Sequence, residues 1–445
     1  MPVSVEKIAD LIYNHSKLKE RFDIAVKNYF CAADILLPDF KIVDGVRWAV
    51  VACDQYTSEP QYWEGAAKAA GDSPSTLNMI LPEVYLDQTE ERVPKINAEM
   101  EKYLKNVLIS HPDSMIFLER TQRDGVIRRG IVGMIDLEEY DFKHGSDSLI
   151  RATEGTVLSR IPPRVKIRRD APIELPHVML LIDDPEKTVI EPLTEKKDRL
   201  DIAYDFDLMC GGGHAKGFFL PESEQKRINE ALSALITPEK MAERYGEGDF
   251  APLLFAVGDG NHSLATAKAC YTELKEKLGE EEARGSLARY ALCEMVNLHD
   301  DALQFEPIYR VVFNVDPVDV VNELRKYSEL LHGNGPSQKV QIFSEIFDSE
   351  YEFTRPEAQL TVGTLQNFLD SYTEAHPEAE VDYIHGEESL IALARGENAV
   401  GFIFSGMEKS QLFKTVLCDG ALPRKTFSMG HAHDKRYYLE CRKIK

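Results

Sequence analysis

An apolar run followed by two closely spaced glycines is the feature that most restricts how this chain can fold. Residues 252–257 (PLLFAV) suit a β-strand that is buried on both faces. Gly258 and Gly260 then permit a sharp turn, and residues 264–278 carry an apolar stripe at helical spacing. The stripe consists of Leu264, Ala267, Tyr271, Leu274 and Leu278. The stretch therefore predicts a strand, a tight turn and a helix, which is typical of α/β proteins.

The turn between this strand and this helix carries polar residues at a place suited to anions. A helix N-terminus presents backbone N–H groups without intrahelical acceptors and the positive end of the helix dipole. Asp259 is a ligand type for a divalent cation, and His262 is suited to contact a phosphate or to move a proton. The same residues also fit an ordinary helix cap with a hydrogen-bonded histidine. The local sequence leaves both interpretations open.

The charge balance excludes several classes of function. The 445 residues include 75 acidic and 52 basic side chains, which gives a net charge of −23. Such a chain is not expected to bind nucleic acid or an anionic membrane, whereas a nucleotide needs only a small positive site. No apolar run approaches the ~20 residues of a membrane span, and the N-terminal stretch does not predict a signal peptide.

The cysteines indicate the compartment. Seven are scattered along the chain without a Cys-x-x-Cys pair, so the sequence predicts neither a zinc site nor a disulfide framework. A dispersed, odd-numbered set suits a reducing compartment, and we expect a cytoplasmic protein.

A second glycine-rich stretch lies at residues 210–217 (CGGGHAKG). Successive glycines let the backbone approach a ligand closely, and His214 and Lys216 would supply positive groups there. Both residues are therefore candidate phosphate contacts. The spacing is not that of a Walker loop, and a connection between two hairpin strands is the alternative interpretation.

Other segments give a coarse outline. Residues 46–53 (VRWAVVAC) predict a further buried strand, and residues 1–30 predict an amphipathic helix. Residues 114–120 and 126–136 flank an Asp-Gly pair and predict a β-hairpin. Glu154 stands between hydroxyl residues in IRATEGT, shortly before a basic segment that is either an anion-facing surface or a solvated face.

Several short motifs, in the order in which they occur, resemble one family. Residues 259–263 (DGNHS) resemble the Asp-Gly-His-His-Arg signature of the family called domain of unknown function 1015. Asp300-Asp301 and residues 307–310 (PIYR) resemble its Asp-Asp…Pro-Thr-His-Arg block. Glu154 lies where the family usually has His-Glu before Thr, and residues 422–426 (LPRKT) resemble its Met-Pro-x-Lys-Ser/Thr end. The resemblance spans nearly the whole chain.

The signature is also similar to that of free-serine kinases of the ParB/sulfiredoxin-like superfamily. We therefore expect a mixed α/β fold in three parts. These are an N-terminal α/β region at residues 1–141, a ParB/sulfiredoxin-like nucleotide-binding region at 142–313 and a C-terminal α/β region at 314–445. No linker rich in Pro, Gly or Ser separates them.

The resemblance also implies roles for individual residues. Glu154 would be the general base, Asp259 would bind Mg²⁺ or phosphate, and His262 would contact phosphate. Arg310 would be a supporting cation. The remaining residues of the implied phosphate-binding turn are Gly258, Gly260, Asn261 and Ser263.

The resulting hypothesis is a nucleotide-dependent kinase that phosphorylates the hydroxyl of a small molecule, with free L-serine as the named acceptor. The implied cofactors are Mg²⁺ and ATP or ADP. The expected partners are the nucleotide and the small-molecule substrate, without nucleic acid or membrane, and self-association is left open.

Three departures from the family pattern support an alternative. Asn261 replaces the first His of the signature, Ser263 replaces its Arg, and Tyr309 replaces the His of the later block. Loss of the guanidinium removes a bidentate, charge-assisted phosphate contact. The alternative is a non-catalytic nucleotide-binding or sensing protein with an eroded active site. A hydrolase that uses His262 or His214 ranks last, because no Gly-x-Ser-x-Gly turn occurs.

Overall fold

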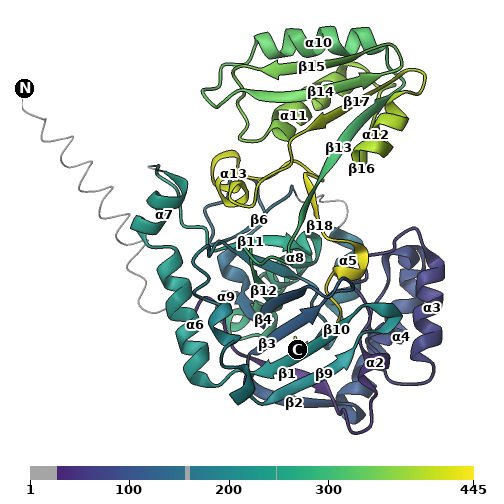
Figure 1. Ribbon diagram of the computed structural model, residues 1–445. Coiled ribbons are helices and arrows are strands. Elements are labelled where there is room, and N and C mark those ends of the chain that lie inside the picture. The colour runs from purple at the N-terminus through teal and green to yellow at the C-terminus, as the bar shows by residue number, and fades with distance from the viewer. Residues whose placement is uncertain (1–27, 156–160, 247) are drawn as a thin grey trace, which may run out of the picture.

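Three β-sheets organise the computed structural model, which describes residues 28–155, 161–246 and 248–445 (Figure 1). The largest sheet has nine strands. In spatial order they are β5 (Tyr140–Asp141), β6 (Ile150–Ala152), β11 (Phe255–Asp259), β8 (Met179–Ile182), β12 (Tyr290–Asn297), β4 (Ile127–Asp136), β3 (Ile116–Thr121), β10 (His214–Phe219) and β9 (Ile202–Asp207). The mixed α/β fold class predicted from the sequence is confirmed.

The predicted strand, turn and helix form the centre of the candidate site. β11 runs parallel to β6 and antiparallel to β8, and its residues Phe255, Ala256 and Val257 are at most 1% exposed. Gly260 adopts a left-handed φ of 78°, and α8 (Asn261–Leu278) begins at the next residue. The apolar run is continuous because both faces of the strand are covered.

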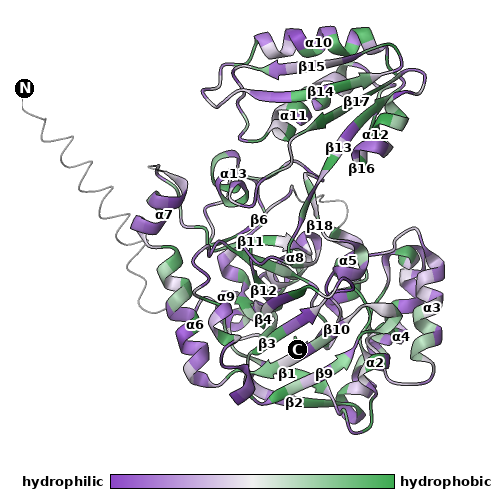
Figure 2. Ribbon diagram, viewed as in Figure 1, coloured by the Kyte–Doolittle hydropathy of each residue, from purple (hydrophilic) through white to green (hydrophobic). Residues whose placement is uncertain are grey.

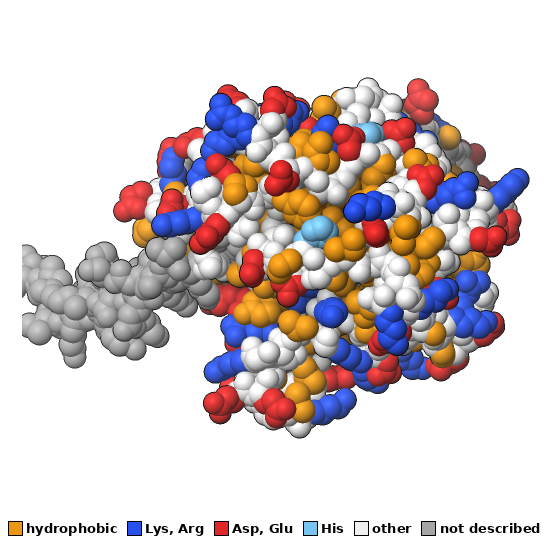
Figure 3. All heavy atoms as spheres, turned by 90° about the horizontal axis from the view of Figure 1, so that it is seen from below, with side chains coloured by type: hydrophobic (Ala, Val, Ile, Leu, Met, Phe, Trp, Pro, Cys, Tyr) orange, Lys and Arg blue, Asp and Glu red, His pale blue; other side chains and the backbone are white. Residues whose placement is uncertain are grey.

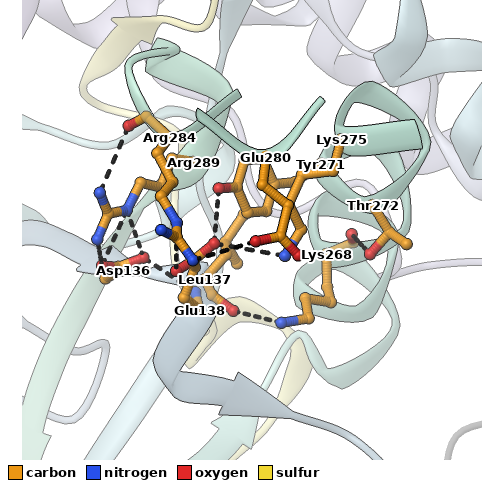
Figure 4. A network of polar contacts seen from close by, with 10 residues as sticks. All are labelled: Asp136, Leu137, Glu138, Lys268, Tyr271, Thr272, Lys275, Glu280, Arg284 and Arg289. Carbon is orange, nitrogen blue, oxygen red and sulfur yellow. Dashed lines mark hydrogen bonds and ion pairs between the residues drawn. The ribbon is translucent and has the colours of Figure 1, made fainter. Parts of the chain in front are cut away.

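Polar contacts hold α8 on the sheet (Figure 4). Lys268 Nζ donates to the backbone oxygen of Leu137 over 2.7 Å, just after the end of β4. Tyr271 Oη donates to Glu138 Oε1 over 2.9 Å, and Lys275 Nζ lies 3.3 Å from the same oxygen. These contacts anchor the middle of the helix, so its N-terminus is fixed at the end of β11.

Further helices cover this sheet. They are α5 (Ile161–Arg169), α6 (Glu222–Leu235), α7 (Pro238–Tyr245) and α9 (Glu280–Arg284). α5 packs on α8 through Ile161, Val165 and Ala265. In Figure 2 hydrophobic and hydrophilic residues occur together along the strands, and α6 and α7 also carry both kinds, as expected for helices with one buried face.

A four-stranded sheet joins distant parts of the chain. Its order is β2 (Leu108–Ser114), β1 (Ala33–Pro38), β19 (Cys441–Lys443) and β7 (Ile173–Glu174). Between β1 and β2 the chain forms the helices α2 (Gly45–Trp48), α3 (Pro60–Ala70) and α4 (Thr89–Asn106). This end of the molecule is seen from below in Figure 3, where hydrophobic side chains gather between charged ones. Ile109 of β2 and Ile202 of β9 are 45% and 56% exposed.

The strand predicted for residues 46–53 is wrong. The Asp44 side chain accepts a hydrogen bond from Val46 N and starts the short helix α2. Val51 then makes only an isolated bridge with Tyr437. The run is apolar because it is buried, not because it forms a sheet strand. The helix predicted for residues 1–30 lies almost entirely outside the described residues.

The third sheet forms the upper part of Figure 1. Its order is β15 (Asp348–Phe353), β14 (Gln338–Ser344), β17 (Ala399–Phe404), β13 (Phe305–Phe313) and β16 (Glu380–His385), and β18 (Phe427–Met429) pairs with the start of β13. Its helices are α10 (Pro317–Glu329), α11 (Thr361–Ala375), α12 (Glu387–Ala394) and α13 (Gln411–Asp419). After β18 the chain returns to the larger body, where β19 lies beside β1.

The predicted region boundaries can be placed on this topology. Residue 141 ends β5, which pairs in parallel with β6 in the nine-stranded sheet. Residue 313 ends β13, which lies within the third sheet. The nine-stranded sheet therefore takes strands from both sides of the first boundary, and the three-region division stays a prediction. Within the described ranges, every helix is too short or too polar to span a bilayer.

Candidate functional site

A cavity of about 660 Å³ lies where β6, β11 and α8 meet the returning segment at residues 425–435. Its wall includes Glu154 and the whole turn that the sequence singled out. The turn residues are Gly258, Asp259, Gly260, Asn261, His262 and Ser263. Glu154 and His262 are 108 positions apart in the sequence, and the parallel pairing of β6 with β11 brings them to one cavity.

The N-terminus of α8 faces this cavity. The first intrahelical bond joins Leu264 N to Gly260 O over 3.0 Å, so the N–H groups of the preceding three residues lack an intrahelical acceptor. No acidic residue lies in the first turn of the helix. A Cβ at Gly258 would lie 2.7 Å from the Leu181 side chain, and one at Gly260 would lie 3.0 Å from Val178 Cα. The tight turn therefore requires both glycines.

Asp259 is held as a carboxylate. Its Oδ1 accepts from Gly260 N over 2.9 Å, and its Oδ2 lies 3.1 Å from Lys435 Nζ. Burial acts to raise the pKa of Asp259, but Lys435, His177 and the Gly260 N–H outweigh it and hold that pKa below its usual value. At neutral pH the side chain can therefore attract a cation.

The surroundings of Glu154 shift its pKa in the opposite direction to that of Asp259. Glu154 follows β6, and its backbone makes an isolated bridge with Leu422. Burial and then the charge of Asp259 raise its pKa, against a hydrogen bond from the backbone of Lys425 and the charges of Lys435 and Lys425. Two carboxyl groups whose environments move their pKa values apart suit different roles in proton transfer and charge binding.

Asn261 bridges the turn and the end of β6. Its Oδ1 accepts from Thr153 N over 3.3 Å. Its Nδ2 donates to Thr153 Oγ1 over 3.3 Å and to Val257 O over 3.2 Å. The amide therefore holds Thr153 against α8. Because Glu154 directly follows Thr153, its position relative to α8 is fixed as well.

Ser263 and His177 form a second polar group on the same wall. Ser263 Oγ lies 3.0 Å from His177 Nε2, and His177 Nδ1 lies 2.7 Å from Tyr438 Oη. Asp54 Oδ2 lies 3.6 Å from His177 Nε2. Tyr438 Oη also contacts Cys53, so this chain of contacts links α8 to residues near both ends of the described chain.

The cavity contains charges of both signs. Lys425, Lys435 and Arg164 are its cations, and Arg164 pairs with Glu83 of η2 (Glu83–Gln88). Asp54 adds a further carboxylate. Positive side chains beside a helix N-terminus favour an anionic ligand.

Arg310 lies behind this wall. Its guanidinium is fully buried and donates to the backbone oxygens of Arg424 and Lys425, each over 3.0 Å, and to Gln366 Oε1. Burial lowers the pKa of Arg310 to about 10. Its contacts hold the segment that carries Lys425, but the Arg310 side chain itself does not line the cavity.

The structure does not bring His214 and Lys216 to this cavity. Both lie on β10, near the far edge of the nine-stranded sheet from β11. The His214 ring lies 2.7 Å from Asp205 and from Asp207, and Lys216 Nζ lies 2.7 Å from Asp205 Oδ2. Both side chains contact carboxylates of β9, away from the turn at residues 258–263, and their role as phosphate contacts stays a prediction.

Sequence reasoning missed several residues of this wall. Lys425 stood in the LPRKT stretch, and that motif was its only signal. Lys435 and Asp54 belonged to no chemical motif, and neither did His177, which contacts Ser263 of the wall; all three come near the turn only through long-range packing.

The wall fits a magnesium ion only in part. Asp259 is a suitable oxygen ligand, but no group of three or more His, Cys, Asp or Glu residues suited to a metal occurs in the described ranges. Mg²⁺ commonly takes one or two carboxylates and completes its shell with phosphate oxygens and water. Asp259 would therefore hold the ion together with a bound nucleotide.

An apolar cavity of about 150 Å³ adjoins the polar one. The two share Glu83, Leu86, Arg164 and Ser263. Leu81, Ile167 and Leu175 are among the side chains that line the apolar part. A ligand with an apolar ring and an anionic group would find matching surroundings on the two sides of Ser263.

Fold and site together define a mixed α/β protein with a polar cavity at a helix N-terminus. The model of the family described as "Protein of unknown function (DUF1015)" matches residues 37–372. The chain therefore belongs to this family, as the motifs in its sequence had indicated. No curated protein matches it.

Solved structures resemble the chain only weakly. A conserved hypothetical protein from Pyrococcus furiosus is 13% identical, with 70% of this chain and 94% of that chain covered and a TM-score of 0.32. A free serine kinase in complex with AMP is 14% identical, with 70% and 90% covered and a TM-score of 0.34. A mutant free serine kinase in complex with ADP is 13% identical, with 70% and 91% covered and a TM-score of 0.34. TM-scores this low carry no argument about this chain.

Proposed function

We propose that this protein binds a nucleotide at the N-terminus of α8 and transfers a phosphoryl group to the hydroxyl of a small molecule. One observation carries the proposal. Glu154, the α8 N-terminus and three cationic side chains surround a single cavity of about 660 Å³. Phosphoryl transfer needs its phosphate charge neutralised, its nucleophile positioned and a proton accepted, and this wall has a group for each task.

The phosphates would lie against the backbone N–H groups that start α8, near Lys425 and Lys435. His262 is a further phosphate contact in this arrangement. Glu154 accepts the proton of the attacking hydroxyl. Its raised pKa makes it a stronger base than an ordinary glutamate, which favours proton transfer near neutral pH. Bound Mg²⁺ would neutralise phosphate charge, and Asp259 would hold it.

The apolar cavity beyond Ser263 suits the base of the nucleotide. Free L-serine is the proposed acceptor, and this choice rests on the resemblance of residues 259–263 to the free-serine kinase signature. A cytoplasmic location also stays a proposal. It agrees with the seven cysteines, which are all free thiols.

Calorimetric titration with ATP and with ADP, each with and without Mg²⁺, tests the binding step. Heat of binding is expected with at least one nucleotide. Absence of heat under all four conditions would remove the proposal. A coupled assay for phosphoserine and for the shortened nucleotide then tests the transfer step.

Glu154→Gln separates binding from chemistry. It should lower the transfer rate by about 100-fold or more while nucleotide affinity changes little, because a base acts only on the acceptor. Asp207→Asn is the matched control, since it also converts a carboxylate to an amide but lies on β9. Equal rates in the two variants would contradict a role of Glu154 as base.

A non-catalytic nucleotide sensor is the second candidate. It is favoured by the contacts of Asn261 with Thr153 and of Ser263 with His177, because two positions of the signature are engaged inside the protein. Nucleotide binding without phosphoserine formation or nucleotide turnover would select this candidate over the kinase.

A further inference from the structure

The Ser263 hydroxyl and the His177 imidazole have no step of their own in the proposed transfer reaction. Ser263 Oγ and His177 Nε2 are 3.0 Å apart, and Ser263 borders both the polar and the apolar cavity. His177 is only 7% exposed. A serine hydroxyl in contact with a buried imidazole is the arrangement of an activated nucleophile.

Hydrogen bonds around Tyr438 are compatible with the tautomer of His177 that this pair needs. Tyr438 Oη lies 3.2 Å from Cys53 N, 3.1 Å from Cys53 Sγ and 2.7 Å from His177 Nδ1. With the Tyr438 proton directed to Cys53 Sγ, its oxygen accepts from His177 Nδ1–H, and Nε2 is then the acceptor for the Ser263 hydroxyl.

Neighbouring groups keep this arrangement chemically consistent. Burial raises the pKa of Tyr438 well above its usual value and that of Cys53 to about 12, so both keep their protons at neutral pH. Asp54 Oδ2 lies 3.6 Å from His177 Nε2, and the charge of Asp259 also acts on the ring. These two carboxylates would stabilise the imidazolium that forms when His177 takes a proton.

We propose that Ser263 is a nucleophile of this cavity and accepts a phosphoryl group from the bound nucleotide, so that the protein phosphorylates itself at this residue. Ser263 Oγ bonds to the terminal phosphorus of the nucleotide. The bond from that phosphorus to its bridging oxygen breaks, and the nucleotide leaves with one phosphate fewer. The hydroxyl proton passes to His177 Nε2. The new phosphoryl group lies at the first turn of α8, where the helix dipole favours it.

The phosphoryl donor in this inference rests on the proposed function, so the test has two arms. In the first arm the full chain is incubated with Mg²⁺ and ATP or ADP, and the phosphorylated peptide is mapped by mass spectrometry. Phosphorylation is expected at Ser263. His177→Gln should slow it by about 100-fold or more, as expected for loss of a general base. Ser263→Thr should keep it, whereas Ser263→Ala should lose it.

The second arm needs no nucleotide. A fluorophosphonate reacts with an activated serine hydroxyl and releases fluoride, so it reports the nucleophile alone. Ser263 should be labelled, and the label should be lost in His177→Gln. Ser233, whose hydroxyl donates to the backbone oxygen of Asn229, is the internal control and should stay unlabelled. Thermal unfolding of His177→Gln verifies that the variant is folded.

The two arms separate the outcomes. Nucleotide binding in calorimetry with neither phosphorylation nor probe labelling at Ser263 would overturn this inference and leave the proposed function standing. Absence of nucleotide binding would overturn the proposed function and the nucleotide as donor, and probe labelling would then support Ser263 as a nucleophile. Tyr438→Phe gives a further check. It should slow labelling and alter its pH profile, because His177 Nδ1 loses its 2.7 Å contact with Tyr438 Oη.

Discussion

Two glycine-rich stretches of this chain each contain a histidine, and the structure uses them in opposite ways. Residues 258–263 pass from β11 into α8 and form the wall of the cavity. Residues 210–217 pass from η7 (Met209–Gly211) into β10, where the chain pairs with β3 and β9. A helix N-terminus leaves backbone N–H groups for a ligand, whereas a strand uses them in the ladder.

The glycines also meet different neighbours. A Cβ at Gly213 would lie only 2.2 Å from the backbone oxygen of Thr121, so this glycine lets two strands approach each other. Gly260 instead allows the left-handed turn that starts α8. A glycine-rich motif therefore predicts close backbone approach, and the element that follows decides whether a ligand or another strand comes near.

The largest contrast is expected between Asp259 and Asp205. Asp259→Asn should lower the phosphoryl-transfer rate by about 100-fold, because it removes a preorganised charge from the cavity. Asp205→Asn removes only the carboxylate that pairs with His214 and Lys216, and should leave the rate unchanged. The coupled nucleotide assay measures both. A similar loss in the two variants would mean that the cavity is not the site of reaction.

Gly213→Ala and Gly260→Ala should separate an effect on folding stability from an effect on nucleotide binding. Gly213→Ala combines a left-handed φ of 87° with a backbone clash and should cost about 3 kcal/mol of stability. Gly260→Ala meets milder contacts and should cost about 1–2 kcal/mol, with weaker nucleotide binding as its main effect. Urea unfolding and calorimetry measure the two quantities. The comparison would fail if Gly213→Ala were the variant that specifically weakens binding.

Two lysines give a smaller contrast. Lys425→Ala should weaken nucleotide affinity about tenfold, because a charge-assisted contact is lost at the cavity wall. Lys216→Ala should leave the affinity unchanged, since its ammonium pairs with Asp205 on the sheet. Titration of both variants with the same nucleotide measures this. An equal loss of nucleotide affinity in the two variants would indicate that Lys216 also contacts the phosphate.

The smallest expected effect is a difference in pH dependence. The pKa of Glu154 is raised above its usual 4.5, so the base is lost as pH falls from neutrality through that raised value. The lowered pKa of Asp205, due first to its hydrogen bond with Lys216, keeps its ion pairs until the pH falls below 3.8. The transfer rate should therefore decline on acidification before stability that depends on Asp205 is lost. A pH–rate profile and unfolding at matched pH values compare the two.

The same raised pKa has a consequence for stability. The folded protein holds the proton of Glu154 more tightly than the unfolded chain does. The stability that Glu154 contributes is therefore lost as the pH rises from 4.5 through its raised pKa. Glu154→Gln should accordingly be slightly more stable than the parent at neutral pH. A less stable variant would show that the carboxylate has a structural role.

Local sequence predicted the parts of the fold that local physics determines. The β11–turn–α8 unit and the hairpin of β3 and β4 follow from apolar patterns and glycine turns alone. The expected strand at residues 46–53 was wrong because the Asp44 cap, which competes with strand formation, was not recognised. Burial alone does not distinguish a strand from a buried helix and loop.

The site was predictable only where a motif marked it. The local pattern marked the turn, and the family resemblance marked Glu154, but their proximity depends on the pairing of β6 with β11, which periodicity does not reveal. His177 and Lys435 carried no motif. The glycine-rich stretch at residues 210–217 joins β9 to β10, which is the hairpin connection that the sequence left open as an alternative.

Residues 425–443 supply Lys425, Lys435 and β19. During synthesis on the ribosome, every other part of the wall emerges before these residues do. A chain that stops short of them has Glu154 and the turn at residues 258–263 but lacks Lys425, Lys435 and the strand that joins β1 to β7. The cavity wall is therefore the last part of this site to be completed in synthesis.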